Sequence, residues 1–234
     1  MKKFILAFIT LFIMTSASLA DSNVYITQSG AALDLDITLD GNANAVGAAN
    51  DRTLLTGANL DVDIDLIGAT NTITGDFIGT GESGSDDLKI NQTGSTNTTA
   101  LNVGSSASTD DVSIIENRVG SSGVTSYIIG STATVQDVSV TVDVVGDDID
   151  IALTENSSSS GSDKTTDIDI ATDSDDVDII VTHTGAGAHK TKLLCTGACG
   201  TSDFTFSQTG ANSTDVDLVV TNAAGSDVDI TITD

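Results

Sequence analysis

Aspartates that alternate with aliphatic residues are the most frequent chemistry-bearing pattern in this sequence. They recur at Asp34 and Asp36, at Asp61, Asp63 and Asp65, at Asp167 and Asp169, at Asp176 and Asp178, at Asp215 and Asp217, and at Asp227 and Asp229. A period of two places each set on one face of a strand. Loosely bound Ca²⁺ is one interpretation, because carboxylate oxygens suit this ion. A solvated face that opposes premature strand pairing is the other, and we prefer it.

Cys195 and Cys199 are the only cysteines, and they lie within one short segment, Cys-Thr-Gly-Ala-Cys. In an oxidising compartment, a local disulfide that closes a tight turn is the first interpretation. Two free thiols are the second. A metal site with His183 and His189 is the third, although the set lacks a recognised zinc spacing.

Signatures of catalysis are weak. Residues 79–84 fit Gly-x-Gly-x-x-Gly, but no helical pattern follows, so they predict a glycine-rich turn. The Gly-x-Ser-x-Gly elbow of hydrolases is absent, and nothing orders the serines, aspartates and two histidines into a triad. We expect no enzymatic activity, no catalytic residues and no resident cofactor or metal.

The chain that positions these residues is a succession of strand-like segments and turns. Polar and aliphatic residues largely alternate in segments at 24–28, 33–39, 60–66, 88–92, 112–115, 135–142, 149–153, 168–170, 177–181, 204–208, 215–220 and 227–233. Such alternation predicts strands, and the Gly, Asn, Ser and Asp residues between them form turns. The spacing is roughly 10 to 13 residues per strand and turn, which is typical of all-β repeats.

The composition favours stacked coils over a conventional globular core. Aromatic residues make up 3% of the chain, and Trp and Pro are absent. Similar aliphatic strands suit stacked layers, and the lack of Pro agrees with strands that are hydrogen-bonded on both sides. We predict an all-β fold, a β-solenoid of strand–turn–strand repeats over residues 21–234. A sandwich or barrel and a disordered chain are the alternatives, and the regular alternation argues against disorder.

The first twenty residues differ from the rest. Lys2 and Lys3 precede an apolar run that ends in small residues at Ala20. This pattern is typical of a secretory signal peptide, so we expect residues 1–20 to be removed, leaving a secreted chain without a transmembrane segment. That chain has 6 basic and 34 acidic residues, a net charge of −28, once Lys2 and Lys3 are removed. Nucleic acid and anionic lipid are therefore poor partners.

Gln-x-Gly is the most specific local motif. It occurs at Gln28 and Gly30, at Gln92 and Gly94, and at Gln208 and Gly210, with Ser22 and Ser202 six residues before two of the glutamines and Asn97 and Asn212 after two of the glycines. In these residues the chain resembles the curlin repeat, Ser-x5-Gln-x-Gly-x-x-Asn-x-Ala, of secreted bacterial curli subunits. The match is partial, since Asp86 takes the serine place before Gln92 and residues 100–180 keep the rhythm without the motif.

The resemblance implies strand–turn–strand coils that polymerise into extracellular amyloid fibres for adhesion and biofilm matrix on the bacterial cell surface. Its partners would be other copies of the chain, an export pore and a nucleator. Glutamine can pair amide to amide along such a stack, and glycine lets a turn take positive φ. The motif residues would then have a structural role. The alternative is a monomeric acidic β-solenoid that binds Ca²⁺ or glycan.

Overall fold

The computed structural model describes residues 21–233 except 31, 49, 51, 58, 80–85, 105–111, 131–136, 157–162, 172–173, 197–198, 211–212 and 222–226. The predicted signal peptide lies outside these residues. Within the described part every regular element is a β-strand. No helix in that part has the length and apolar character needed to cross a membrane.

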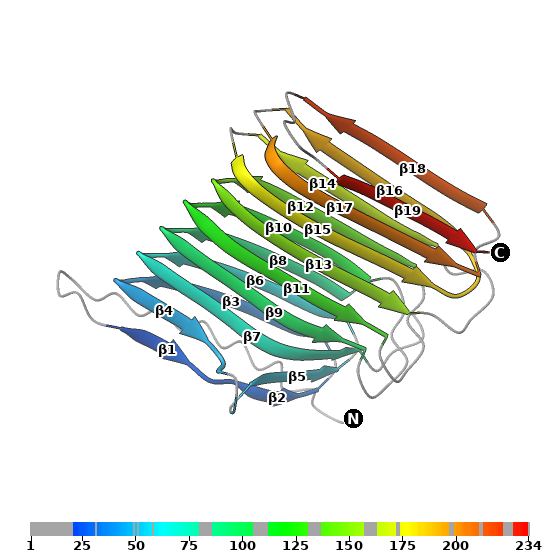
Figure 1. Cartoon of the computed structure of the whole chain (residues 1–234). Coiled ribbons are helices and arrows are strands. Elements are labelled where there is room, and N and C mark those ends of the chain that lie inside the picture. Colours follow the sequence, from blue (N-terminus) through cyan, green and yellow to red (C-terminus); the bar gives the residue numbers. More distant parts are fainter. Residues whose placement is uncertain are drawn as a thin grey trace, which may run out of the picture.

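The strands form two parallel sheets that lie face to face (Figure 1). The eleven-stranded sheet contains β1 (Ser22–Val24), β2 (Thr27–Ser29), β4 (Ala43–Val46), β5 (Thr53–Gly57), β7 (Thr70–Gly79), β9 (Thr96–Val103), β11 (Ser122–Ile129), β13 (Asp148–Asn156), β15 (Ser174–Thr184), β17 (Cys199–Thr209) and β19 (Asp227–Thr233). The eight-stranded sheet contains β3 (Leu33–Asp40), β6 (Leu60–Ile67), β8 (Asp86–Thr93), β10 (Val112–Val119), β12 (Val138–Val145), β14 (Lys164–Ile170), β16 (Ala188–Cys195) and β18 (Ser213–Val220).

From β6 onward the chain winds through one strand of each sheet per coil, and neighbouring coils stack in register. Ile37, Ile64 and Ile90, for example, are successive partners in the eight-stranded sheet. Bonded partners one coil apart, such as Asn71 and Asn97, are 26 residues apart in sequence. This architecture is a β-solenoid, so the predicted fold class is confirmed and the sandwich, barrel and disorder alternatives are wrong. Strands β10 to β15 belong to the same stack, which places the motif-free middle of the chain in the solenoid.

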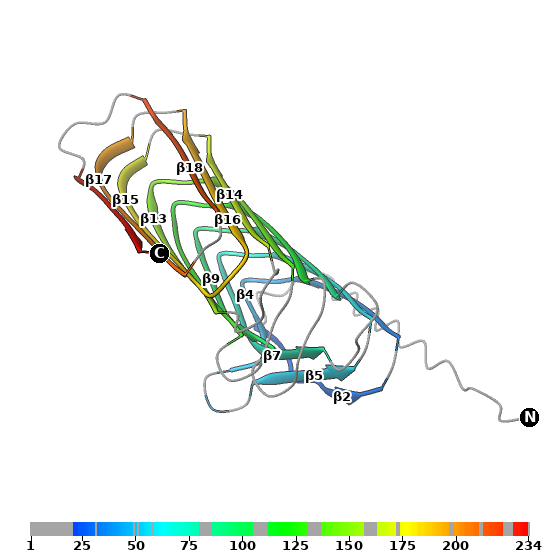
Figure 2. The same ribbon diagram turned by 90° about the vertical axis from the view of Figure 1, so that its right-hand side faces the viewer.

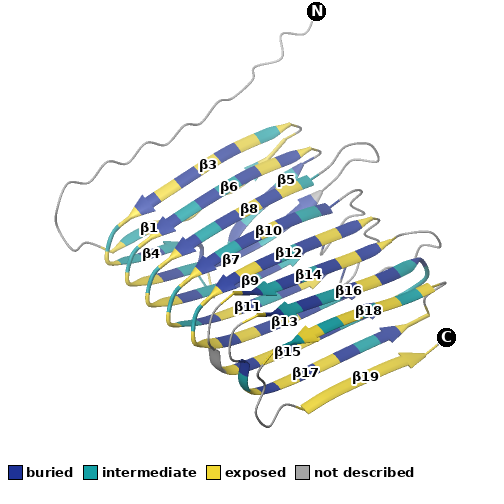
Figure 3. Ribbon diagram, turned by 90° about the horizontal axis from the view of Figure 1, so that it is seen from above, coloured by how far each residue is buried: buried dark blue, intermediate teal, exposed yellow. Residues whose placement is uncertain are grey.

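Alternation in the sequence decides which side chains enter the space between the sheets. In β6, Leu60, Val62, Ile64 and Leu66 are each at most 3% exposed, whereas the aspartates between them face outward. Figure 3 shows the same alternation on strand after strand. Burial of one such aliphatic side chain contributes about 1.5–3 kcal/mol. No single coil can cover its own inner face, so this contribution depends on the coils above and below.

The eleven-stranded sheet bends at its N-terminal end. There β4 and β5 both pair with β7, and β1 and β2 pair with β4 and β5 in turn. Figure 2 shows β2 and β5 running in a different direction from β4. Arg52 secures the bend, because its guanidinium donates to the Asp76 carboxylate and to the carbonyl oxygens of Gly75 and Ala100.

Candidate functional site

A column of glycines occupies the turns that lead from the eight-stranded to the eleven-stranded sheet. A Cβ atom added to Gly68, Gly94 or Gly120 would lie 1.9–2.0 Å from the carbonyl oxygen of the preceding glycine of the column. Such distances are far below van der Waals contact, so the close approach of successive coils requires glycine. Positive φ is not the reason at Gly94 or Gly30. Of the three motif glycines only Gly210 adopts it, at +76°.

Three asparagines that follow these turns form a buried ladder. Asn44 Nδ2 donates to Asn71 Oδ1 at 3.0 Å, and Asn71 Nδ2 donates to Asn97 Oδ1 at 2.9 Å. Each Nδ2 also donates to a backbone carbonyl oxygen of the next coil, at 2.9–3.1 Å. The ladder therefore satisfies its buried amides by repetition of one residue type, apart from Asn44 Oδ1 at its first level, which has no hydrogen-bond partner among the described residues. Asn97 is the member that the curlin-like motif singled out.

Arg118 and Gly123 end the asparagine ladder. In register, Arg118 follows Gln92 and Gly123 follows Asn97. The Arg118 side chain is buried, and a Cβ atom added to Gly123 would lie 2.6 Å from its Nε. The missing side chain at Gly123 thus makes room for the guanidinium group.

Glu116 accepts hydrogen bonds from three side chains between the sheets. Its carboxylate accepts from Thr99 at 2.9 Å, from Tyr127 at 2.8 Å and from Thr125 at 2.9 Å, and Thr125 in turn accepts from Arg118 Nη1 at 2.8 Å. Burial, with a smaller contribution from Glu116, raises the pKa of Tyr127 well above its usual value, so its hydroxyl remains a donor. We name Gln92, Thr99, Glu116, Arg118, Thr125 and Tyr127 the Glu116 network.

A second buried polar group spans β13 to β17. We name it the Glu155 network, and its members are Glu155, Lys164, Thr166, His183, His189, Thr191 and Gln208. Glu155 Oε2 lies 3.2 Å from His183 Nε2, and Thr166 donates to Glu155 Oε1 at 3.0 Å. The imidazole rings of His183 and His189 meet edge to face with centroids 5.4 Å apart. Lys164 Nζ lies 3.4 Å from His189 Nε2.

Burial shifts the protonation equilibria of the Glu155 network. It raises the pKa of Glu155 to about 8, against the opposing effects of Thr166 and Lys164. It lowers the pKa of His183 to about 3, and the charges of His189 and Lys164 act in the same direction. Glu155 and His183 are in contact, so their titrations are coupled, and the shifts favour a protonated Glu155 beside a neutral His183. Neither side chain has exposed surface, which closes the pair to solvent in the folded chain.

The three motif glutamines do not form a common ladder, so amide-to-amide stacking among them is wrong. Gln92 is buried in the eight-stranded sheet next to Arg118, whereas Gln28 and Gln208 belong to the eleven-stranded sheet. The motif therefore occurs at different positions within the coil, once in the eight-stranded sheet and twice in the eleven-stranded sheet. Gln208 instead stacks on His183, and its Nε2 lies 3.5 Å from His183 Nδ1. The segments His183-Thr184-Gly185 and Gln208-Thr209-Gly210 are equivalent turns, which is a signal of that stacking in the sequence.

The two motif serines share one column with the asparagine ladder. Ser22 pairs in register with Asn44 before the ladder begins. Ser202 is buried and pairs with Val177, several coils after the ladder ends. Asn212 lies outside the described residues. The motif positions thus mark one structural column at two distant levels of the stack.

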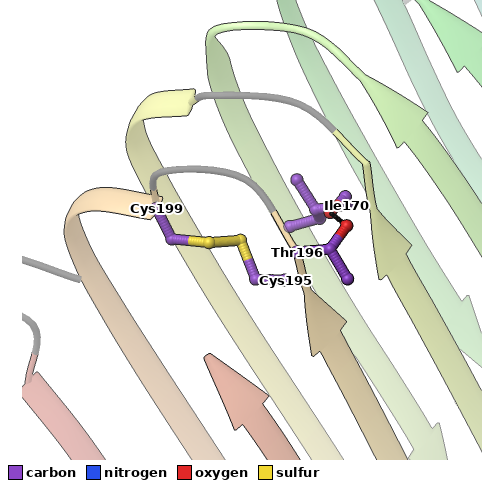
Figure 4. The surroundings of a disulfide bond; sticks show 4 residues. All are labelled: Ile170, Cys195, Thr196 and Cys199. Atoms are coloured by element: carbon purple, nitrogen blue, oxygen red, sulfur yellow. Dashed lines mark hydrogen bonds between the residues drawn. A yellow bond between two sulfur atoms is a disulfide. The ribbon is translucent and has the colours of Figure 1, made fainter. Parts of the chain in front are cut away.

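Cys195 and Cys199 are joined by a disulfide that closes the turn between β16 and β17 (Figure 4). Both residues are fully buried, and their Cα atoms are 6.4 Å apart. Cys195 follows Ile170 in register, so the disulfide continues an aliphatic column of the interior. The free-thiol and metal-site interpretations are therefore wrong, and His183 and His189 belong to the Glu155 network instead.

The alternating aspartates lie on the outer faces of both sheets. In register, Asp34, Asp61 and Asp87 follow one another on the eight-stranded sheet. Burial and then the neighbouring aspartates raise the pKa of Asp61, and Asp178 on the other sheet shows the same direction. Among the residues described, no group of three or more His, Cys, Asp or Glu side chains is arranged to hold a metal ion.

The C-terminal end of the solenoid leaves its inner layer uncovered. In the described structure, β18 and β19 are the last strands of their sheets (Figure 1). Val228, Ile230 and Ile232, the inner row of β19, are 40–50% exposed, whereas Phe204 and Phe206 one coil earlier are 1% exposed. Figure 3 shows β19 exposed along its length.

The N-terminal end of the described structure also has unpaired strand edges. In the residues described, β1, β2 and β3 are the first strands of their sheets. A cavity of about 270 Å³ lies between them, and its aliphatic lining comes from Val24, Ile26, Leu33, Leu35, Ile37 and Leu39. Both ends of the described structure therefore have unpaired strand edges, but their inner rows differ: Leu35, Ile37 and Leu39 of β3 are only 3–6% exposed, whereas the inner row of β19 is uncovered.

These features define the class of the protein as a parallel β-solenoid with two strands per coil from β6 onward and with unpaired strand edges at both ends of the described structure. In comparisons with known proteins, no family, no curated protein and no solved structure matches the chain. The resemblance to curlin at Gln28, Gln92 and Gln208 therefore stays a prediction from the sequence.

Proposed function

We propose that this chain is a secreted structural subunit, similar to curlin, that self-assembles into extracellular amyloid-type fibres for adhesion and biofilm matrix on a bacterial surface. The observation that carries the proposal is the pair of unpaired strand edges at the two ends of the described solenoid. Unpaired parallel edges are templates for further strands. The exposed inner row of Val228, Ile230 and Ile232 adds apolar surface that a further coil would cover.

The mechanism is edge-to-edge addition in the register that the chain already uses. In that register Val216, Leu218 and Val220 of β18 meet Leu35, Ile37 and Leu39 of the next copy. Leu35, Ile37 and Leu39 are already at most 6% exposed, so the gain comes from the side chains of β18 and β19. It is a fraction of the about 1.5–3 kcal/mol for burial of a fully exposed aliphatic side chain, and it works against the cost of association. The same contact repeats at every junction, so one subunit type suffices for an unbranched fibre.

Secretion is supported by the pattern of Lys2, Lys3 and the apolar run to Ala20. The resemblance to curlin adds an export pore and a nucleator as partners of the secreted chain. The proposed role of the buried glycines, asparagines and glutamines is structural, with no enzymatic step and no resident cofactor.

A monomeric acidic solenoid that binds Ca²⁺ or glycan is the second candidate. It is favoured by the in-register row of Asp150, Asp178, Asp203 and Asp227 on the outer face of the eleven-stranded sheet. Aligned carboxylates about 4.8 Å apart repel one another, and a divalent cation would relieve that repulsion.

The test uses residues 21–234, the predicted secreted chain, purified unfolded and diluted into buffer with and without Ca²⁺. We would follow thioflavin fluorescence and image the product by electron microscopy. Unbranched fibres in calcium-free buffer, with a lag that seeds abolish, are the expected result. A β-rich monomer that persists at high concentration would contradict fibre formation, and folding only with Ca²⁺ would favour the second candidate.

A further inference from the structure

We propose that the junction between copies is opposed by carboxylates on one of its two sheets, so that ionic strength controls the addition of each copy. This inference rests on the proposed function. The occupant of each open end is a second copy of this chain, stacked head to tail, because the end layers continue the coil-to-coil interface that the solenoid already forms.

Two outward columns of the eight-stranded sheet both begin and end with aspartate. The first runs from Asp34 through Asp61 and Asp87 and ends with Lys190 and Asp215. The second column starts at Asp36 and ends at Asp217 through the same strand pairings. If β18 of one copy pairs with β3 of the next in the existing register, Asp215 faces Asp34 and Asp217 faces Asp36.

Toward the C-terminal end of the chain, lysines relieve the same columns, whereas Asp34, Asp61 and Asp87 follow one another directly at the N-terminal end. Lys192 lies in register between Asp167 and Asp217, and its Nζ is 2.9 Å from the Asp167 carboxylate. Lys190 precedes Asp215 in the same way. The aspartates of β18 thus already have lysine neighbours on the preceding strand, β16. At a junction, the strand on their other side, β3 of the next copy, would bring only further negative charge.

The eleven-stranded sheet lacks this conflict at the junction. Its outward column that ends with Asp203 and Asp227 starts at Asn23 of β1. A head-to-tail contact would therefore place an amide beside Asp227. The opposition is confined to the eight-stranded sheet, where four carboxylates meet.

Salt governs how strongly these carboxylates act. Neighbouring strands are about 4.8 Å apart, and like charges directly opposite across a strand pair are destabilising. The screening length is about 10 Å at 0.1 M salt and about 3 Å at 1 M. The junction carboxylates therefore repel at low salt and are screened at high salt, whereas the apolar contacts between Val216 or Leu218 and the next copy persist.

The experiment measures seeded elongation of the mature chain at about 20 mM and about 500 mM NaCl, which bracket weak and strong screening. Two variants neutralise the two sides of the junction, D34N/D36N and D215N/D217N. The matched control is D61N/D63N, which has the same net charge as D34N/D36N. It relieves the same two pairs within the chain, Asp34–Asp61 and Asp36–Asp63, and the pair Asp61–Asp87 in addition. In the control the carboxylates at the strand edge remain.

We expect wild-type elongation to rise steeply with salt, and both junction variants to elongate roughly tenfold faster than wild type at low salt and within about twofold of it at high salt. The control should follow wild type. Equal wild-type rates at both salt concentrations, or a control as fast as D34N/D36N, would overturn the inference and leave the fibre proposal standing. Absence of fibres from every variant at both salt concentrations would overturn both.

Discussion

The coils from β3 to β9 and those from β13 to β17 provide hydrogen-bond partners for their buried polar side chains in different ways. In the first region one residue type repeats, and Asn44, Asn71 and Asn97 satisfy one another along the stack. In the second region unlike residues meet, with Glu155 against His183 and Lys164 against His189. The turns differ as well, since glycines close the first set and the disulfide closes the turn between β16 and β17.

The difference shows two kinds of contact that hold neighbouring coils together within one fold. A repeated asparagine needs only another copy of itself one coil away, so the ladder could extend by translation. The Glu155 network needs specific partners from β13 to β17 and cannot be extended by adding a similar coil. We infer that the N-terminal coils behave as a true repeat, whereas the C-terminal coils behave like a globular core held by contacts between unlike polar groups.

The largest effect should come from filling the glycine column. In Gly94→Ala, the added Cβ atom would lie 1.9 Å from the Gly68 carbonyl oxygen, so the coils must separate. We expect a loss of at least about 4 kcal/mol in the free energy of unfolding, or failure to fold, since such backbone clashes belong to the most damaging class of substitution. Denaturant unfolding measures it.

Gly30→Ala is the control for this prediction, because no atom lies within 4 Å of its added Cβ. It should change the free energy of unfolding by less than about 1 kcal/mol. Equal stability of the two variants would show that the coils separate at little cost, and the repeat-like description of the N-terminal half would fail.

A smaller loss is expected from interrupting the asparagine ladder. Asn71→Ala removes the acceptor of Asn44 Nδ2 and the donor to Asn97 Oδ1 in a buried column. Buried polar groups without partners cost about 1–3 kcal/mol, so we expect a loss of about 2–3 kcal/mol by denaturant unfolding. Asn102→Ala, which removes a half-buried donor to Asp76, should cost less than half as much. A similar loss in both variants would contradict the ladder as a source of stability.

Much of this fold could be predicted because strand alternation and stacking depend on local sequence. The period-two pattern in residues 60–66 predicts the inner row of β6 residue by residue. The pairing of Cys195 with Cys199 follows from their proximity in a short turn. Neither inference needs knowledge of which coil lies above which.

The polar interior could not be predicted in the same way, because it depends on strand phase and on coil register. In β10 the pair Ile114 and Ile115 breaks the alternation, so the sequence alone leaves the side of Glu116 undecided, and Ile115 is the residue that faces outward. Glu155 was detectable, since it continues the inward phase of Ile151 and Leu153. The phase of the Gln-x-Gly motif depends on loop lengths, which place Gln92 and Gln208 in opposite sheets.

The C-terminal coils should respond to pH in a way that β6, with its aliphatic inner row, does not. His183 has a lowered pKa, so its contribution to stability is lost as pH falls from 6.5 toward 3. Glu155 has a raised pKa, so its contribution is lost as pH rises from 4.5 toward 8. Between pH 4.5 and 6.5 the slopes cancel, and stability outside this window falls by up to about 1.4 kcal/mol per pH unit.

Amide hydrogen exchange of β15, compared with that of β6 at each pH, measures this window. Burial also lowers the pKa of Lys164, whose contribution decreases as pH falls below 10.5 and so opposes Glu155 in alkaline solution. The difference between wild type and Glu155→Gln isolates the carboxyl group. That variant should lose the decrease between pH 6.5 and 8, and an unchanged profile would place the titrating group elsewhere.

The smallest effects should come from ion pairs at the surface. They test whether the N-terminal and C-terminal coils differ in their surface contacts as well as in their buried polar contacts. Arg52 in the N-terminal coils is less exposed than Lys192 and donates to two carbonyl oxygens besides Asp76. Arg52→Ala should therefore cost roughly 1 kcal/mol, because half-buried carbonyl groups lose a charged donor. Lys192→Ala removes an exposed pair with Asp167 and should leave Tm unchanged within error. If instead Lys192→Ala lowers Tm more than Arg52→Ala does, surface charge rather than the buried network holds the C-terminal coils together.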